Sequence, residues 1–412
     1  MFFKLKLVNT KKVMKYFYIV ILMFASFIIK AQYTIADDLI KSDSTIVVAA
    51  ALFDEYLPLV KGKNIAVVAN HSSVVANEHL VDVLTKKGVS IKKIFTPEHG
   101  FRGDADAGEK IKSSIDPITN IPVVSLYDSK KKPLPSDLKG IELVLFDIQD
   151  VGARFYTYIS TMTYVMEACA ENNIPMIILD RPNPNGYYVD GPVLKKGFES
   201  FIGMHPVPIV HGMTIGEYAQ MVNGESWLKA GVKANLTVIK TKGYTHKYLY
   251  QLPINPSPNL RTMASIYMYP SMCLFEGTVV SVGRGTDKPF EVYGHPNFKN
   301  ASFSFIPKSQ KGASAPLYEG KKCFGYEVAD FGLIYIKDSQ ALYLDWLVDS
   351  YNEMKLGEAF FNNYFNILAG NDLLKKQIIQ EKSVDEIKKT WQKDLESFKI
   401  IRKKYLLYPD FE

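Results

Sequence analysis

Short apolar runs alternate with amphipathic stretches from about residue 52 to residue 293. This alternation is typical of βαβ units and predicts an α/β domain with a largely parallel sheet. Helices are predicted at residues 78–87 and 156–171. Buried strands are predicted at 64–69, at about 89–95, and at 121–127, 141–148 and 174–179.

Four of these strands run into loops that carry polar residues with Gly or Pro. The carboxyl ends of parallel strands meet at one edge of a sheet, where open α/β folds bind ligands, so we expect a site there. Neither GxGxxG nor GxxxxGKS/T follows the first strand, so no nucleotide site is indicated. The residues at these four ends are Asn70 and His71, Glu98 and His99, Asp147 and Asp150, and Asp180 and Arg181, with Arg154 and Asn183 close behind.

The loop TPEHGFRGDADAGE, residues 96–109, carries the densest set of ionisable side chains. Its three glycines allow the backbone to turn tightly. A carboxylate beside a histidine at a strand end predicts an active-site loop; the alternative is a solvated turn, which Gly and Asp also favour. The ionisable residues of the loop are Glu98, His99, Arg102, Asp104, Asp106 and Glu109.

Two further polar segments follow. A loop with His205 and His211 precedes a predicted helix that is capped near Thr214, with Glu217 three residues on as in a capping box. Residues 273–291 are predicted to form one β-like run with three glycines and a second polar cluster. The charged residues of this cluster are Glu276, Arg284, Asp287 and Glu291.

The sequence changes character after about residue 297. Strands are predicted at 324–329 and 331–336, and helices at 341–354 and 385–405. We therefore expect two domains, as a chain of this length favours: a sheet domain over residues 48–296 and a smaller α+β auxiliary domain over 297–412.

Residues 1–32 have the pattern of a secretory signal peptide. A lysine-rich start precedes the apolar run 17–29, which is short for a membrane-spanning helix, and a small residue lies near a plausible cleavage point. The segment holds six of the 49 Lys and Arg residues and no acid, which leaves 43 basic residues against 43 acidic ones. We expect an exported protein, periplasmic or secreted, attached to a membrane only if the signal stays uncleaved, and a nucleic-acid partner loses its main support.

The residue pattern gives little support for a metal site or for catalysis by a serine or cysteine nucleophile. The nitrogen ligands available are His71, His99, His205 and His211, but no HxH or HExxH spacing occurs, so no metal is predicted. No GxSxG motif is present, and the three cysteines lie in apolar or aromatic surroundings without zinc-type pairing, so we expect mostly buried, unpaired thiols.

Paired carboxylates fit better. Glycoside hydrolysis uses one protonated carboxyl as general acid and a second, ionised carboxylate as nucleophile or base. Glu98 beside His99 is the first candidate, and the acid that faces it is Asp147, Asp150 or Glu276. Arg102, Arg181 and Arg284 could neutralise an acidic group on a substrate, or could pair with these acids structurally.

Five motifs, in order and at this spacing, resemble the bacterial exo-β-N-acetylmuramidases of the NamZ type, formerly a domain of unknown function. The resemblance covers about residues 48–410. It implies a Rossmann-like catalytic domain with an auxiliary C-terminal domain, no cofactor and no nucleotide, and release of N-acetylmuramic acid from the non-reducing ends of peptidoglycan glycans. The motifs are TPEHGFRG, FDIQDVGARFYTY, LDRPNPNG, VHGMTIGEYA and FEGTVVSVGRGTDKPFE.

Carried onto this chain, the resemblance makes Glu98 the essential carboxylate. The substrate's lactyl carboxylate would need a cation, for which Arg284 or Arg181 is the candidate, and Asp147 or Glu276 would support the transition state or activate water. His99 completes the predicted catalytic group. The side chains predicted to bind the substrate are Asn70, His71, Arg102, Asp150, Arg154, Asp180, Arg181, Asn183, His211, Arg284 and Asp287.

Two alternatives stay open on the sequence alone. A non-catalytic envelope protein that binds muropeptides or glycan ends would keep the aromatic residues and arginines without needing Glu98 for turnover. A metal-dependent hydrolase or amidase would use His71, His99 and an aspartate, and would lose activity with a chelator.

Overall fold

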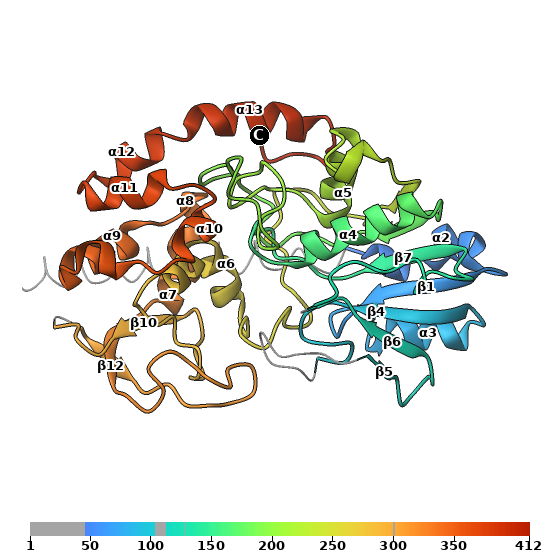
Figure 1. Ribbon diagram of the computed structural model, residues 1–412, viewed down its shortest axis with the longest axis horizontal. Helices are drawn as coiled ribbons and strands as arrows, with labels where there is room; N and C mark the ends of the chain where they lie inside the picture. The colour runs from blue at the N-terminus through green and yellow to red at the C-terminus, as the bar shows by residue number, and fades with distance from the viewer. Residues whose placement is uncertain (1–45, 104–112, 128, 300) are drawn as a thin grey trace, which may run out of the picture. The chain divides into compact units, whose positions relative to one another are not determined.

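A seven-stranded sheet forms the first part of the chain in the computed structural model (Figure 1), which describes residues 46–103, 113–127, 129–299 and 301–412. The strand order is β5-β6-β4-β1-β7-β8-β9, and all pairs are parallel except β5 with β6. The largely parallel sheet confirms the predicted α/β class. The strands are β1 Asn64–Ala69, β4 Ser90–Thr96, β5 Ser114–Ile115, β6 Pro122–Ser125, β7 Leu143–Asp147, β8 Met176–Leu179 and β9 Leu236–Ile239.

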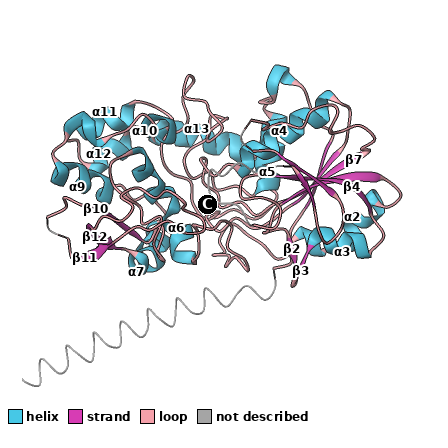
Figure 2. Cartoon of the chain, turned by 60° about the horizontal axis from the view of Figure 1, so that its bottom comes forward, coloured by secondary structure: helices cyan, strands magenta, loops and turns pink. Residues whose placement is uncertain are grey.

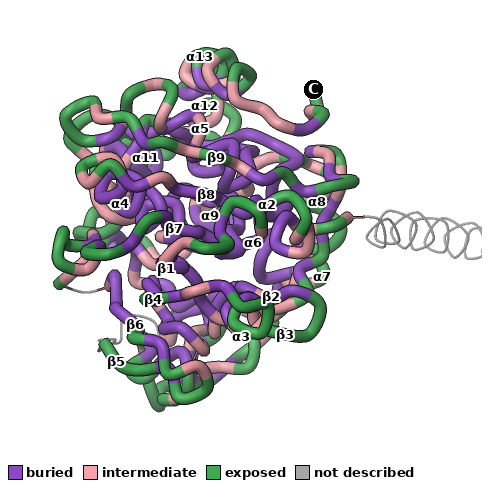
Figure 3. Tube along the Cα trace, turned by 90° about the vertical axis from the view of Figure 1, so that its right-hand side faces the viewer, coloured by how far each residue is buried: buried purple, intermediate pink, exposed green. Residues whose placement is uncertain are grey.

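Helices cover both faces of this sheet (Figures 1 and 2). Alternate residues of β1 point to opposite faces: Ile65 and Val67 join the core under α2 Phe53–Val60 and α3 Leu80–Lys86. Ala66 and Val68 join the core under α4 Tyr158–Glu171 and α5 Ile215–Gly224. Burial on both faces explains why the central strands are almost entirely apolar, and all their residues except Asn64 are buried (Figure 3).

The registers place the polar strand ends side by side. Val68 at the end of β1 pairs with Phe95 of β4 on one side and with Phe146 of β7 on the other, while Phe146 also pairs with Ile178 of β8. The residues that follow β1, β4, β7 and β8 therefore leave the sheet at one edge, as predicted.

The second part of the chain is built on helices and a small antiparallel sheet of order β10-β12-β11. The helix α6, Met263–Met272, is buried from residue 264 to 272 and leads from the sheet part into this region. The remaining elements are β10 Val292–His295, β11 Phe303–Phe305, β12 Cys323–Glu327, α7 Ala329–Phe331, α8 Lys337–Ser339, α9 Asp345–Met354, α10 Phe365–Ala369, α11 Leu373–Ile379, α12 Val384–Lys389 and α13 Gln392–Lys403.

Four predicted segments have another structure, in whole or in part, or are divided differently. Residues 78–79 pair with Val74–Val75 as a short hairpin, so α3 begins only at Leu80. Residues 331–336 are helical, with a π-turn over Gly332–Ile336, and not a strand. The predicted helix 385–405 is two helices, α12 and α13. The predicted β-like run 273–291 begins as the 3-10 helix Cys273–Gly277 and continues through turns.

One apolar core runs through both parts of the chain. Met166 of α4, Phe275, Trp346 of α9 and Phe398 of α13 belong to the same buried cluster. The small sheet includes β10, which precedes residue 296, together with β11 and β12, which follow it. The expected domain boundary at 296/297 stays a prediction. No helix within the described ranges is both long and apolar enough to cross a membrane.

Candidate functional site

Glu98 lies just beyond the end of β4, half-buried in a pocket. The Tyr127 hydroxyl donates a hydrogen bond to Glu98 Oε1 at 2.9 Å, and Thr157 Oγ1 donates to Oε2 at 3.3 Å. Tyr127 follows β6, and Thr157 is the N-cap residue that precedes α4, a helix end whose dipole favours negative charge. A hydroxyl at each oxygen fixes the plane of the carboxyl group while leaving it in the pocket.

Tyrosines make the wall behind Glu98. The hydroxyls of Tyr156 and Tyr158 both donate to the Pro256 carbonyl, at 2.8 and 3.3 Å, and their rings meet edge to face. Burial raises the pKa of Tyr158, so its phenol stays protonated at neutral pH. The pocket is lined by Glu98, His99, Phe155, Tyr156, Thr157, Tyr158, Ser257, Asn259, Leu260, Tyr269, Arg284 and Phe290.

His99 is buried and adopts a left-handed backbone conformation, with φ at 72°, followed by Gly100 at 77°. Two successive positive φ values turn the chain sharply after the strand, and a non-glycine residue adopts this conformation at some cost. The turn keeps both Glu98 and His99 at the pocket. Asp104, Asp106 and Glu109 of the same loop lie outside the described residues.

Glu276 and Arg284 form an ion pair at the same pocket. Arg284 Nε donates to Glu276 Oε1 at 2.5 Å, and the guanidinium carbon lies 5.0 Å from the centre of the Phe290 ring. Burial raises the pKa of the Tyr364 phenol, and the negative charges of Glu276 and Glu98 raise it further. Tyr364, which belongs to the second part of the chain, therefore lies near both carboxylates.

Asp147 and Arg181 pair with each other away from this pocket. Arg181 Nε and Nη2 donate to the two Asp147 oxygens at 2.6 and 2.8 Å, and both side chains are almost fully buried. Arg181 Nη2 also donates to the Val74 carbonyl at 3.1 Å. The structure thus places this acid and this arginine in a bidentate pair beneath the strand ends.

Asp150 and His211 are buried together. Asp150 Oδ2 accepts from the Gly152 amide at 2.7 Å, while Oδ1 has no hydrogen-bond partner among the described residues. Burial raises the pKa of Asp150 to about 7 and lowers the pKa of His211 to about 3. His211 Nε2 lies 3.9 Å from Asp150 Oδ2, and His211 is neutral at neutral pH.

Asn70 and His71 follow β1 at the same edge. Asn70 Oδ1 accepts from the Ser72 amide and hydroxyl, and its amide group lies beside the Tyr158 phenol. His71 Nε2 donates to the Asn255 carbonyl at 2.9 Å, and burial lowers its pKa. Through these contacts Asn70 and His71 connect Tyr158, on the wall of the pocket, with the loop that begins at Asn255.

Four of the residues predicted to bind substrate hold other parts of the fold. Asp180 accepts from Thr214, Gly216 and Tyr408, and thereby fixes the start of α5 and the C-terminal tail. Asn183 Nδ2 donates to the Met213 carbonyl. Arg154 donates to the carbonyls of Pro192, Val207 and Leu368, and Arg102 donates to Asp82 and Asp116. Asp287 is exposed.

Sequence reasoning missed the hydroxyl groups around Glu98. Tyr156, Thr157 and Tyr158 lie in the FYTY part of the FDIQDVGARFYTY motif. The position of this motif at a polar strand end is a sequence signal that could have identified these residues. Tyr127 and Tyr364 carry no such signal, because their neighbourhood depends on tertiary structure.

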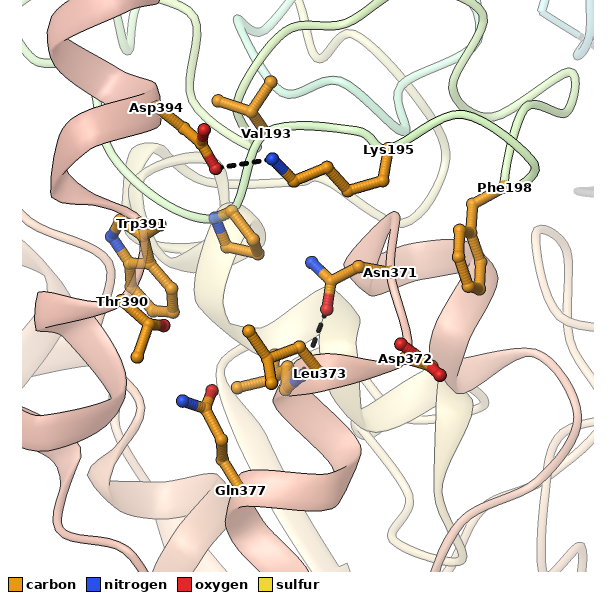
Figure 4. A pocket seen from close by; sticks show the side chains of 12 residues that line it. Val193, Lys195, Phe198, Asn371, Asp372, Leu373, Gln377, Thr390, Trp391 and Asp394 are labelled. Atoms are coloured by element: carbon orange, nitrogen blue, oxygen red, sulfur yellow. Dashed lines mark hydrogen bonds and ion pairs between the residues drawn. The ribbon is translucent and has the colours of Figure 1, made fainter.

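A second pocket lies where the loop 192–198 meets α11 and α13 (Figure 4). Its lining is mostly apolar, with Trp391 on one side and the Lys195–Asp394 ion pair, 2.7 Å long, across the rim. Asn371 Oδ1 accepts from the Leu374 amide at 3.0 Å. None of the predicted site residues lines this pocket.

Within the described ranges, no group of three or more His, Cys, Asp or Glu side chains converges as a set of metal ligands. His205 instead contacts the Tyr218 hydroxyl at 3.1 Å and stacks on Trp227. Cys169, Cys273 and Cys323 are buried and unpaired, as expected.

Comparison with known proteins identifies relatives along nearly the whole described chain. Residues 65–264 match the family model "Exo-beta-N-acetylmuramidase NamZ, N-terminal", and residues 267–408 match its C-terminal counterpart. The chain is 39% identical over 391 residues to the peptidoglycan β-N-acetylmuramidase NamZ of Bacillus subtilis (strain 168), covering 87% of this chain and 90% of the relative.

Two crystal structures of DUF1343 family proteins from Bacteroides fragilis NCTC 9343 have the same fold. One has a TM-score of 0.84 at 46% identity and covers 89% of this chain and 100% of its own. The other has a TM-score of 0.74 at 28% identity and covers 88% and 99%.

Proposed function

Because the chain belongs to the exo-β-N-acetylmuramidase NamZ family, we propose that it is a glycoside hydrolase that releases N-acetylmuramic acid from the non-reducing ends of peptidoglycan chains. The observation that carries the proposal onto this chain is the Glu98 carboxyl, held by two hydroxyls in an aromatic pocket with Arg284. Aromatic walls pack on the C–H faces of a sugar, and a positioned carboxyl can transfer a proton.

In this proposal Glu98 is the general acid. Its proton passes to the glycosidic oxygen while the bond from the sugar's C1 to that oxygen breaks. Water then adds its hydroxyl to C1, and the proton that remains restores the acid form of Glu98. Tyr127 and Thr157 hold the carboxyl group in place through both states.

We further propose that the protein is exported and meets its polymer in the envelope. The charge and apolar pattern of residues 1–32 supports this. Fractionation of expressing cells, with N-terminal sequencing of the envelope form, checks it: a form that begins near residue 33 is expected, and an uncut cytoplasmic form contradicts it.

The function is tested with a chromogenic N-acetylmuramic acid β-glycoside and its N-acetylglucosamine counterpart, each with and without EDTA. Release from the muramic compound alone, unchanged by EDTA, is expected. No release from either compound, together with muropeptide binding that does not need Glu98, would favour a binding protein. Release that EDTA abolishes and a divalent ion restores would favour a metal-dependent hydrolase.

A further inference from the structure

We propose that Arg284 binds the lactyl carboxylate of the N-acetylmuramic acid unit, and that Glu276 positions Arg284 and is not the second catalytic carboxylate. The inference rests on the proposed function, because the lactyl carboxylate is what distinguishes this sugar from N-acetylglucosamine. It assigns a specificity residue and changes the role that the sequence suggested for Glu276.

The guanidinium of Arg284 is only partly used by the protein. Its Nε donates to Glu276 Oε1 at 2.5 Å, whereas its Nη1 and Nη2 have no hydrogen-bond partner within the described part of the chain. The side chain is 27% exposed and lines the same pocket as Glu98. Two parallel N–H groups at one edge of a guanidinium match the two oxygens of a carboxylate.

Neighbouring groups fix the direction in which these N–H groups point. The guanidinium lies over the Phe290 ring, 5.0 Å from its centre, and Phe290 packs edge to face on Tyr269. An arginine held by an ion pair at Nε and by a ring against its face loses little freedom when it binds a ligand. Arg284 is thus preorganised to bind an anion.

The other arginines of the predicted site are engaged elsewhere. Arg181 forms the buried bidentate pair with Asp147. Arg154 is surrounded by backbone carbonyls, and Arg102 donates to two aspartates. Among these four arginines, Arg284 is the one that lines the pocket with Glu98.

Both carboxylate oxygens of Glu276 accept hydrogen bonds, as expected of a residue that positions Arg284. Oε1 accepts from Arg284, and Oε2 accepts from the Cys273 thiol at 3.5 Å. The Glu276 carbonyl accepts from Asn362 Nδ2 at 3.0 Å, and Gly277 lies so close to Phe365 that a Cβ there would meet the Phe365 Cα at 2.5 Å. The short helix that carries Glu276 is therefore fixed against α10.

The test measures kcat/KM on three nitrophenyl β-glycosides: N-acetylmuramic acid, the same sugar with its lactyl carboxyl as a methyl amide, and N-acetylglucosamine. We expect Arg284→Met to lower kcat/KM roughly 10- to 100-fold on the free acid, the range for hydrogen bonds between charged groups. The amide and N-acetylglucosamine compounds should change less than threefold or so, so the preference for the acid disappears. Equal losses on all three compounds would overturn the assignment of Arg284.

Two further variants separate positioning from catalysis. Arg284→Lys keeps the charge without the paired N–H groups and should restore only part of the preference for the acid. Glu276→Gln can still accept from Nε, so we expect a KM effect confined to the free acid with kcat nearly kept. A kcat loss of 100-fold or more on all three compounds would make Glu276 catalytic and contradict the proposal.

Arg261→Met, which removes a half-buried arginine that binds the Pro258 carbonyl, is the matched control.

Calorimetric titration with free N-acetylmuramic acid decides the inference even if no glycoside is cleaved. The wild-type protein should bind this sugar more tightly than N-acetylglucosamine, and Arg284→Met should bind the two equally. A preference that survives in Arg284→Met contradicts the assignment, whereas binding without any turnover contradicts only the proposed function. Thermal unfolding of each variant confirms that it is folded.

Discussion

At the scale of single residues, the roles of the acids depend on partners that lie far away in the sequence. Glu98, Asp147 and Asp150 all lie at the ends of predicted strands, so their positions alone do not rank them; the neighbouring His99 and the family resemblance made Glu98 the first candidate. In the structure Asp147 is neutralised by Arg181, Asp150 is buried beside neutral His211, and only Glu98 lies in the pocket. The location of the site was predictable from the strand ends and Glu98 from its motif, but the partners that set Asp147 and Asp150 apart from Glu98 were not predictable.

The raised pKa of Asp150 makes a prediction about stability. The pKa of Asp150 is about 7 in the folded protein and 3.8 in the unfolded chain. This difference stabilises the folded state at pH values below about 4, and the stabilisation is lost as the pH rises through 7. Asp150→Asn stays neutral, so its free energy of unfolding relative to wild type should rise by roughly 2–4 kcal/mol between pH 4.5 and pH 8. Urea unfolding at both pH values measures this difference.

Asp287→Asn is the control for this measurement, because Asp287 is exposed. Its difference from wild type at the two pH values is the reference against which the change for Asp150→Asn is measured. A difference for Asp150→Asn that is the same at both pH values would mean that Asp150 is already ionised in the folded protein.

At the scale of elements, continuous apolar runs correctly predicted the central strands. The strand predicted from the short apolar run at residues 331–336 was wrong. Residues 64–69 were predicted to the residue, because burial on both faces requires an uninterrupted apolar strand. Residues 331–336 have a similar composition but form a helical turn, and Leu333, Ile334 and Tyr335 are substantially exposed there. A short apolar run does not distinguish a strand from a helix without its tertiary neighbours.

One buried arginine of the last long helix, α13, links this helix to the sheet part of the chain. Arg402 donates from Nε and Nη2 to the Gly212 carbonyl at 3.0 and 2.8 Å, and pairs with Asp410, while being almost fully buried. Arg402→Met should lower the free energy of unfolding by about 2–4 kcal/mol, because a buried carbonyl and a carboxylate lose their donors. Chemical denaturation checks this against Lys403→Met, an exposed neighbour, which should leave stability within about 0.5 kcal/mol. Equal stability of the two variants would contradict this role of Arg402.

At the scale of the whole molecule, the regions matched by the N- and C-terminal models of one family share a single apolar core. The family models divide the chain between residues 264 and 267, at α6, and we propose this division in place of 296/297 because it keeps the three-stranded sheet intact. The apolar cluster nevertheless runs from α4 to α13 without interruption. Sequence composition indicated a change near residue 297 but could not show how much core the two parts share.

This shared core predicts that residues 46–412 unfold as one unit. Differential scanning calorimetry should show a single transition whose calorimetric and van't Hoff enthalpies agree. Residues 46–264 expressed alone should lack a cooperative transition, because the face of α4 and α5 that packs in the shared cluster would be exposed. Two separate transitions, or a cooperatively folded 46–264 fragment, would contradict a shared core.

The central claim, that Glu98 is the acid of an exo-β-N-acetylmuramidase, is tested most directly by varying the leaving group. Glu98→Gln and wild type are compared on a muramic acid glycoside with a nitrophenyl leaving group and on one whose leaving group is a sugar alcohol. A general acid typically contributes about 10²–10⁴-fold. The account predicts a loss in that range on the sugar leaving group and a clearly smaller loss on nitrophenol, which departs without a proton. Near-full turnover by Glu98→Gln on the sugar compound, or equal losses on both, would contradict it.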